Sequence, residues 1–205
     1  MRRLLAATTL LAGLAVASQA SAALVTSLPG GTILAMPVVN YQGTGPQTLA
    51  PGVTWSSTHS NSVFGYVGNY ALDGNGNWNT LPFMGLAGSS SSMTIAFDTP
   101  VSAVGGFINY GAPIYGVPTI AAYDASDMLI ESYTLSISTP GGLNDGAFYA
   151  ITQGTASIAY FRISGAPTVM RDVTVLTAVT ETPEPASLAL LGAGLLGLAA
   201  IHRRR

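Results

Sequence analysis

The stretch IAYFRIS, Ile158–Ser164, places an arginine between two large apolar side chains. Successive side chains of a β-strand point to opposite faces, so Phe161 and Ile163 lie on one face and Arg162 on the other. A strand with one face in a hydrophobic core and the other in solvent has this pattern. The stretch therefore predicts a half-buried β-strand.

Short apolar or alternating runs of this kind recur along the chain, separated by Gly, Pro, Asn, Asp and Ser. In one of them Val173 and Val175 form a similar inward pair. Between Leu24 and Val179 we find no heptad repeat and no convincing amphipathic helix. The predicted strands are Ile33–Asn40, Val53–Ser57, Val63–Val67, Met93–Phe97, Val104–Tyr110, Thr119–Tyr123, Leu129–Ser138, Phe148–Ile151, Ile158–Ser164 and Val169–Leu176. The breakers between them include Pro29-Gly30-Gly31, Asp98-Thr99-Pro100, Asp124–Asp127 and Pro140-Gly141-Gly142.

Many short strands with turn residues between them predict an all-β fold, an antiparallel β-sandwich or jelly roll. We place this body at residues 23–179. Gly88–Ser92 predicts a flexible, long loop within it and not a domain boundary, because neither side has residues enough for a sandwich of its own.

The first 22 residues have the features of a secretory signal. Arg2 and Arg3 precede an apolar run, Leu4–Ala17, and Ala20 and Ala22 make the small-x-small pattern that signal peptidase accommodates. We predict a signal helix in residues 1–22 and cleavage after Ala22. The alternative is an N-terminal membrane anchor, for which the apolar run is short.

Charge and cysteine content exclude several kinds of partner and chemistry. Between Ala23 and Thr182 the chain carries eight acidic residues against only two basic ones, Arg162 and Arg171. Phosphate backbones repel so acidic a body, so nucleic acid is not an expected partner. The chain has no cysteine, which excludes disulfides, thiol catalysis and cysteine-ligated zinc.

The C-terminal segment combines three features in order. Pro183-Glu184-Pro185 closes a linker at residues 180–185, and a charge-free run, Ala186–Ile201, precedes Arg203–Arg205. As a transmembrane-like helix the run of 16 residues is about 24 Å long, short of the roughly 30 Å hydrocarbon layer. The arginines favour the cytoplasmic side, so the prolines lie on the outer face. The alternatives are a permanent anchor and a glycolipid-anchor signal, which needs no terminal arginines.

This arrangement closely resembles the PEP-CTERM sorting signal of Gram-negative bacteria, over about the last 24 residues. The resemblance implies that an exosortase, a membrane protease of the producing cell, recognises the signal and removes the helix. The recognition residues that it implies are Pro183, Glu184, Pro185, Arg203, Arg204 and Arg205. It also implies transient residence in the inner membrane, then the cell surface or the extracellular polysaccharide matrix.

Three stretches of the body are similar to bodies that commonly precede PEP-CTERM tails. They read VSAVGGFINYGAP, PTIAAYDASDMLIESYTLSISTPGGLNDGAF and SIAYFRISG, at residues 101–113, 118–148 and 157–165. Those bodies resemble lectin-like or galactose-binding-like jelly rolls, which implies a fold and no defined active site.

The stretch LDGNGNWN, residues 72–79, has the spacing of an oxygen-ligand site. Its alternating residues Asp73, Asn75, Asn77 and Asn79 match the opening of an EF-hand calcium loop. That loop needs Gly at its sixth position and Glu at its twelfth, where this chain has Trp78 and Met84. Asn and Gly also form tight turns, which is the interpretation that we favour, with calcium as the alternative.

Four aromatic side chains, Trp55, Tyr66, Tyr70 and Trp78, suit either a platform for sugar rings or, more simply, a β core. The single histidine of the body, His59, lies in a Ser-rich loop without a Gly-x-Ser-x-Gly elbow. Asp124 and Asp127 flank a predicted hairpin turn, and Asp172 is either a ligand or a charge partner of Arg171.

No phosphate-binding loop, dinucleotide fingerprint or zinc motif is present, so we predict no catalytic residues, no metal and no cofactor. The predicted function is that of an exported, exosortase-processed protein with a structural or interaction role at the envelope or in exopolysaccharide. The alternative is a lectin-like carbohydrate-binding module, and a third hypothesis is an extracellular glycan hydrolase that uses two of the acids.

Overall fold

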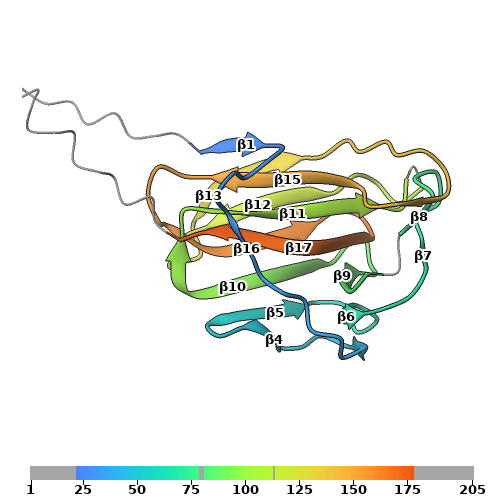
Figure 1. The fold of residues 1–205 in the computed structure, drawn as a ribbon, viewed down its shortest axis with the longest axis horizontal. Helices are drawn as coiled ribbons and strands as arrows, with labels where there is room; N and C mark the ends of the chain where they lie inside the picture. The colour runs from blue at the N-terminus through green and yellow to red at the C-terminus, as the bar shows by residue number, and fades with distance from the viewer. Residues whose placement is uncertain (1–21, 79–80, 113, 178–205) are drawn as a thin grey trace, which may run out of the picture.

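Two antiparallel sheets pack face to face in the computed structural model, which describes residues 22–78, 81–112 and 114–177 (Figure 1). The predicted terminal helices, Asn79, the Pro-Glu-Pro segment and the terminal arginines lie outside these residues. The described residues hold no helix that is long and apolar enough to cross a membrane. The predicted all-β sandwich is confirmed.

The larger sheet, sheet A, has the strand order β1-β15-β11-β17-β9-β6-β3, and β2 also pairs with β17. Its strands are β1 (Ala23–Val25), β2 (Thr32–Ile33), β3 (Tyr41–Gln42), β6 (Val63–Tyr66), β9 (Phe83–Leu86), β11 (Ala103–Tyr110), β15 (Ala147–Thr152) and β17 (Thr168–Leu176). The short strands β1 and β3 therefore form its two edges.

The second sheet, sheet B, has the order β13-β12-β16-β10-β5-β4. Its strands are β4 (Gln47–Ala50), β5 (Val53–Ser57), β10 (Ser92–Val101), β12 (Thr119–Tyr123), β13 (Leu129–Thr134) and β16 (Ile158–Ser164). A small third sheet, sheet C, joins β7 (Tyr70–Ala71), β8 (Asn77–Trp78) and β14 (Leu143–Asn144) at one end of the sandwich (Figure 1, right).

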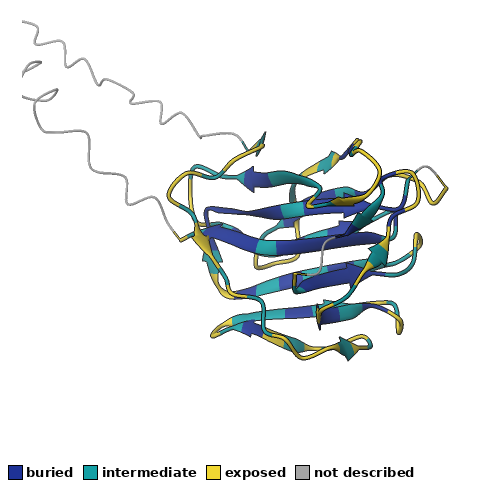
Figure 2. Cartoon of the chain, turned by 45° about the vertical axis from the view of Figure 1, so that its right-hand side comes forward, coloured by how far each residue is buried: buried dark blue, intermediate teal, exposed yellow. Residues whose placement is uncertain are grey.

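The hydrophobic core fills the space between sheets A and B, and the central strands carry most of the buried residues (Figure 2). The stretch Ile158–Ser164 behaves as its pattern predicts: Phe161 and Ile163 are buried, whereas Arg162 faces outward. The Arg162 guanidinium stacks on Tyr123 at 4.3 Å from the ring centroid and pairs with Asp127 at 2.6 Å. This alternation sets which face of sheet B is buried.

A β-bulge interrupts the pairing of β17 with β11. Gly105 pairs with Thr174 and Phe107 with Arg171, so two residues of β17 lie opposite Gly106 alone. One of the two, Asp172, has a φ of 50°, which is in the left-handed region. A Cβ on Gly106 would come within 2.6 Å of the Arg171 carbonyl oxygen, so glycine is required there.

The bulge positions a buried arginine. Arg171 is only 8% exposed, and its guanidinium lies 4.8 Å from the ring centroid of Phe107. It pairs with Asp145, at 3.2 Å, and with Asp172. Of the two roles expected for Asp172, the structure supports that of charge partner.

The predicted strands are present with one exception, Ile33–Asn40. β5, β12 and β16 have the predicted bounds. The predicted strand Ile33–Asn40 is wrong beyond its first residue, because Pro37 has no N–H to donate and Asn40 has a φ of 48°. The turn predicted at Asp98-Thr99-Pro100 is also wrong, since β10 continues through it with an irregular register. The predicted long loop at Gly88–Ser92 is a short connection between β9 and β10.

We expect Gly105→Ala to destabilise the protein, because the added Cβ would collide with the backbone of Tyr149 and Ala150 on β15. Overpacking of this kind costs about 1–3 kcal/mol of unfolding free energy. Gly141→Ala is the matched control, since no atom lies within 4 Å of its added Cβ. Urea denaturation of both variants measures the difference, and equal losses of stability would contradict the packing described.

Candidate functional site

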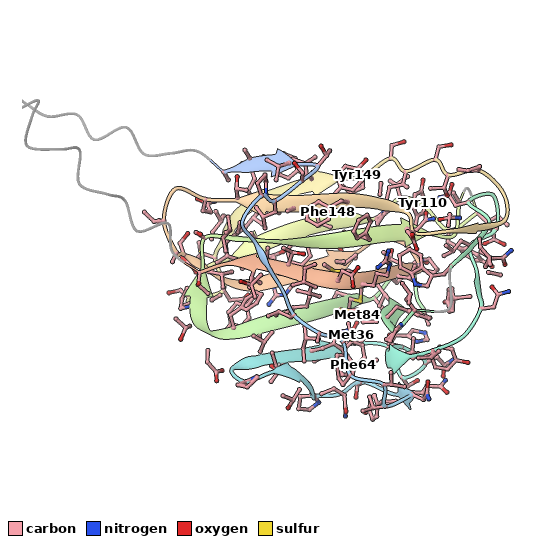
Figure 3. All side chains as sticks on the ribbon, in the orientation of Figure 1. Met36, Phe64, Met84, Tyr110, Phe148 and Tyr149 are labelled. Atoms are coloured by element: carbon pink, nitrogen blue, oxygen red, sulfur yellow. The ribbon has the colours of Figure 1, made fainter. Side chains whose placement is uncertain are left out.

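A pocket opens at the end of the sandwich where β9 and β11 finish and β17 begins. Its volume is about 470 Å³. Tyr110, the last residue of β11, lies toward this end (Figure 3, right). The pocket is lined by Tyr70, Ala71, Asp73, Ala87, Gly88, Ser89, Gly111, Tyr115 and Pro167.

Backbone hydrogen bonds hold the walls of the pocket together. Gly111 N–H donates to the Pro167 carbonyl at 3.1 Å, which extends the pairing of β11 with β17 into the loops. Gly74 N–H donates to the Ala112 carbonyl at 2.6 Å, and Asp73 forms an isolated parallel bridge with Ala112. The turn that carries Asp73 is therefore tied to the loop after β11.

The Asp73 carboxylate lies close to the backbone of Gly111. A Cβ on residue 111 would lie 3.0 Å from Asp73 Oδ2, so glycine lets the carboxylate lie against the backbone. Asp73 itself has a φ of 48°, a left-handed conformation that Asp tolerates better than most residues. The local backbone thus turns a carboxylate toward the pocket.

Tyr70 forms part of the inner wall, with its ring edge-on to Phe83 at a centroid distance of 5.7 Å. Burial raises the pKa of the Tyr70 phenol above its usual value, and the charges of Asp73 and Tyr115 raise it further. The phenol therefore stays protonated at neutral pH and can donate a hydrogen bond as well as accept one. Tyr115, in contrast, is 48% exposed and presents its ring to solvent.

The stretch at residues 72–79, for which a turn was the favoured interpretation and a calcium loop the alternative, forms a turn at residues 72–76. Asn75 N–H donates to the Leu72 carbonyl and Gly76 N–H to the Asp73 carbonyl, at 2.9 and 3.1 Å. The Asn75 amide is buried and donates to the carbonyls of Tyr110 and Ile137, both at 3.1 Å. Its oxygen accepts the Thr139 N–H at 3.3 Å. The side chain is thus committed to the protein, which supports the turn interpretation for Asn75.

The other members of this stretch have separate places. Asn77 lies in β8 and pairs with Ala71 of β7 and Leu143 of β14, whereas Asp73 lines the pocket. Among the residues that the structure describes, no group of three His, Cys, Asp or Glu side chains lies close enough to hold a metal ion.

A second polar network supports the same end of the sandwich and was not predicted. Asn109, which is fully buried in β11, donates to Thr139 Oγ1 at 3.1 Å and to Asn144 Oδ1 at 2.7 Å. Asn144 in turn donates to the Asn75 carbonyl at 2.7 Å. The available sequence signal was an asparagine within the apolar run of β11, where a buried amide must find partners.

The tryptophans are buried in hydrophobic clusters and do not form a sugar platform: Trp55 lies in the core between the sheets, and Trp78 lies in a second, smaller cluster with Leu72, Phe83 and Val169. Trp55 and Trp78 are both 0% exposed. Trp55 packs on Phe64 at 5.4 Å between ring centroids, and Trp78 packs edge-on to Phe83 at 6.3 Å. Of the four aromatics singled out by sequence, Tyr70 alone lines the pocket, and Tyr115 joins it from a loop that the sequence did not flag.

His59 does not form a nucleophile–base pair with its neighbouring serines. Its Nδ1 accepts the Asn61 N–H at 3.1 Å, and the contact to Ser57 Oγ comes from the His59 backbone N–H at 3.2 Å.

Asp124 and Asp127 occupy the predicted hairpin turn: Asp124 Oδ1 accepts the N–H groups of Ser126 and Met128, at 2.8 and 2.9 Å.

Comparison with known families adds the decisive observation on the tail. Residues 181–205 match the PEP-CTERM protein-sorting motif. The match spans Pro183-Glu184-Pro185, the apolar run and Arg203–Arg205, so the resemblance seen in the sequence is confirmed. The PEP-CTERM motif implies a protein that is exported and processed by an exosortase.

The other comparisons say less. No curated protein matches the chain significantly. The chain is similar to the solved structure of CsCBM6-3 from Clostridium stercorarium in complex with cellobiose, with 16% sequence identity and a TM-score of 0.36. The similarity covers 68% of this chain and 94% of that chain. We draw no conclusion about a ligand from it.

We expect Asn75→Ala to lower the free energy of unfolding by about 2–4 kcal/mol, since it removes hydrogen bonds to two buried carbonyls and a backbone N–H. Asn77→Ala is the control within the same stretch. Chemical denaturation with calcium and with a chelator should give the same loss for Asn75→Ala. A loss that disappears on chelation would show that Asn75 acts through a bound ion.

Proposed function

We propose that the mature protein is a non-catalytic binding module, displayed at the cell surface or in the extracellular polysaccharide matrix. In this proposal the pocket at the loop end holds part of a polysaccharide chain. The observation that carries it is the combination of lining groups: two tyrosines, one carboxylate, a serine and glycine backbone in one pocket.

These groups suit a sugar. A sugar ring offers C–H groups on its faces and hydroxyl groups at its edge. The exposed Tyr115 ring can pack against the C–H face, as amphipathic tyrosines do in many binding sites. The Asp73 carboxylate and the Tyr70 phenol can bond to hydroxyl groups. The volume of about 470 Å³ lies within the usual range for small-molecule sites.

The charge of the pocket favours a neutral sugar. Asp73 is the charged residue that lines it, and its negative charge repels phosphate or uronate groups. An uncharged segment of polysaccharide therefore fits better than an acidic one.

The same inventory argues against hydrolysis. Glycosidases of the usual kinds place two carboxyl groups on either side of the scissile bond, about 5–10 Å apart. Among the described residues that line this pocket, Asp73 is the single Asp or Glu. We therefore propose binding without turnover.

The targeting segments support export of such a module. In this proposal signal peptidase cleaves after Ala22, and an exosortase of a Gram-negative cell then reads Pro183, Glu184 and Pro185 at the inner membrane. β1 begins at Ala23, so removal of residues 1–22 leaves the strand whole.

The pocket proposal predicts the effect of three substitutions. Tyr115→Ala should lower the affinity for the producer's own neutral polysaccharide fragments by about 5- to 30-fold, equivalent to roughly 1–2 kcal/mol. Tyr70→Phe and Asp73→Asn should also weaken binding, because the first removes the phenol hydroxyl and the second replaces a charged acceptor oxygen by an N–H donor, while both keep the shape.

Isothermal titration calorimetry with residues 23–182 measures these affinities. Tyr160→Ala, on β16 of sheet B, is the control, since Tyr160 does not line the pocket. Binding that survives all three pocket substitutions, or that falls equally with Tyr160→Ala, would place the site elsewhere.

The sorting proposal predicts the outcome of a triple substitution. Changing Pro183, Glu184 and Pro185 to alanine should leave export intact and block removal of the tail, because the signal peptide is unchanged while the protease loses its recognition segment. The uncleaved protein should accumulate in the inner membrane, as it should in a strain without the exosortase. Immunoblots of membrane and released fractions test this, and normal release of the variant would point to a different protease.

A further inference from the structure

Both ends of the described chain lie at the same end of sheet A. Thr152 pairs with Ala23 on one side and with Ala103 on the other, and Ala103 also pairs with Leu176. The first residue of β1 and the last residue of β17 therefore lie at the same end of the sheet, with β15 and β11 between them (Figure 1, left). We call this the terminal end.

The pocket lies at the opposite end. Tyr110, the last residue of β11, pairs with Thr168, the first residue of β17. The hydrogen bond from Gly111 N–H to the Pro167 carbonyl lies just beyond this pair, at the same end of the two strands. β11 runs between the two ends with eight residues, which at about 3.3 Å per residue separates them by about 25 Å. Sheet C, next to the pocket, also lies at this end (Figure 1, right).

The chain between β17 and the sorting motif is short. Six residues, 177–182, join Leu176 to Pro183. Fully extended, the seven Cα–Cα steps from Leu176 to Pro183 span at most about 25 Å. When an exosortase holds Pro183 at the membrane surface, Leu176 must lie within this distance of the surface. The strands place Leu176 about 25 Å from the pocket end, and the loop residues that line the pocket lie beyond the strand ends. An inverted domain with its pocket on the membrane would therefore need the linker at or beyond full extension.

We infer that, before processing, the sandwich stands on the outer face of the inner membrane with its terminal end toward the bilayer and its pocket directed away from it. Two connections of sheet B then face the membrane. Asp124–Met128 follows Tyr123, which pairs with Tyr160 near the start of β16, and Gln153–Ser157 leads directly into β16 at Ile158. Ile158 lies at the terminal end, since it pairs with Val101 just before β11 begins. If the proposed function holds, the pocket can bind polysaccharide while the tail is still attached, and cleavage releases a protein that already holds its ligand.

The absence of cysteine makes the orientation measurable, since a single introduced cysteine can be labelled without background. Thr155 and Ser126 are exposed residues at the terminal end, and each is replaced by cysteine in a separate variant. Ser90, between β9 and β10, and Ser60, between β5 and β6, are exposed residues at the pocket end. Each is also replaced by cysteine in a separate variant. None of the four residues lines the pocket.

Each cysteine is placed in the full chain that carries alanine at residues 183–185, and the membrane-held protein is isolated by flotation. The label is a fluorophore, and the probe is a quencher attached to a lipid headgroup. We expect strong loss of fluorescence at residues 126 and 155 and little loss at residues 60 and 90. Equal quenching at both ends, or stronger quenching at residues 60 and 90, overturns the inference. Failure to recover any membrane-held chain overturns it too, because no such stage would then exist.

A second measurement separates this inference from the proposed function. Neutral polysaccharide fragments are added to the membrane-held chain and, in parallel, to residues 23–182 in solution. Equal affinity in both forms supports binding before release. Loss of binding in the membrane-held form alone overturns binding before release. Loss in both forms removes the proposed function but leaves the orientation, which the quenching measures without any ligand.

Discussion

The pairing of β11 with β17 is the contact on which the rest of the protein depends. β17 is the last described strand, and it contributes Met170, Val173 and Val175 to the core between the sheets. Its first residue lies beside the pocket and its last residue leads to the sorting tail. One antiparallel ladder therefore supports the core, the pocket wall and the exit of the chain. The bulge opposite Gly106 is the irregularity that lets this ladder accommodate Arg171 and its two carboxylate partners.

Buried amides do at the pocket end what disulfides do in many exported domains. The chain has no cysteine, so its long connections need other cross-links. Asn75 ties the turn after β7 to residues of two other segments, Tyr110 and Ile137. Asn109 and Asn144 continue the network toward the connection between β14 and β15. Each bond contributes only about 1 kcal/mol, but loss of any one leaves buried polar groups without partners. The pocket loops thus rest on a support that does not depend on the redox state of the compartment.

The sequence predicted the central strands well, because their burial follows from local pattern. Phe161 and Ile163 alternate with Arg162, and such a period is visible without knowledge of the partner strand. Two other strands, Tyr41–Gln42 and Phe83–Leu86, were not predicted, for the converse reason. Tyr41–Gln42 is a strand because β6 lies beside it, and Phe83–Leu86 is buried because β17 and β6 flank it. Neither segment has a pattern of its own that indicates a strand.

The pocket shows the same limit. The sequence analysis named Asp73 and Tyr70 as candidate residues, but for roles other than lining a common pocket. Ser89, Tyr115 and Pro167, which also line the pocket, come from connections far apart in the sequence. Only the register of β11 with β17 brings these connections together. The tail is the opposite case, since its three elements are adjacent in sequence and the order itself carries the information. Local chemistry was therefore predictable, and chemistry assembled by long-range pairing was not.

The shortness of the outer strands of sheet A lowers the tendency of the protein to aggregate by strand addition. Edge strands expose unpaired backbone groups, and long flat edges invite other chains to add to the sheet. β1 has three residues and β3 has two, so each offers little template for such growth. On sheet B one edge strand, β13, includes the charge of Glu131, which discourages the same addition, and the other, β4, has only four residues. The edges of both sheets therefore offer little template for the addition of another chain, which limits aggregation through strand pairing.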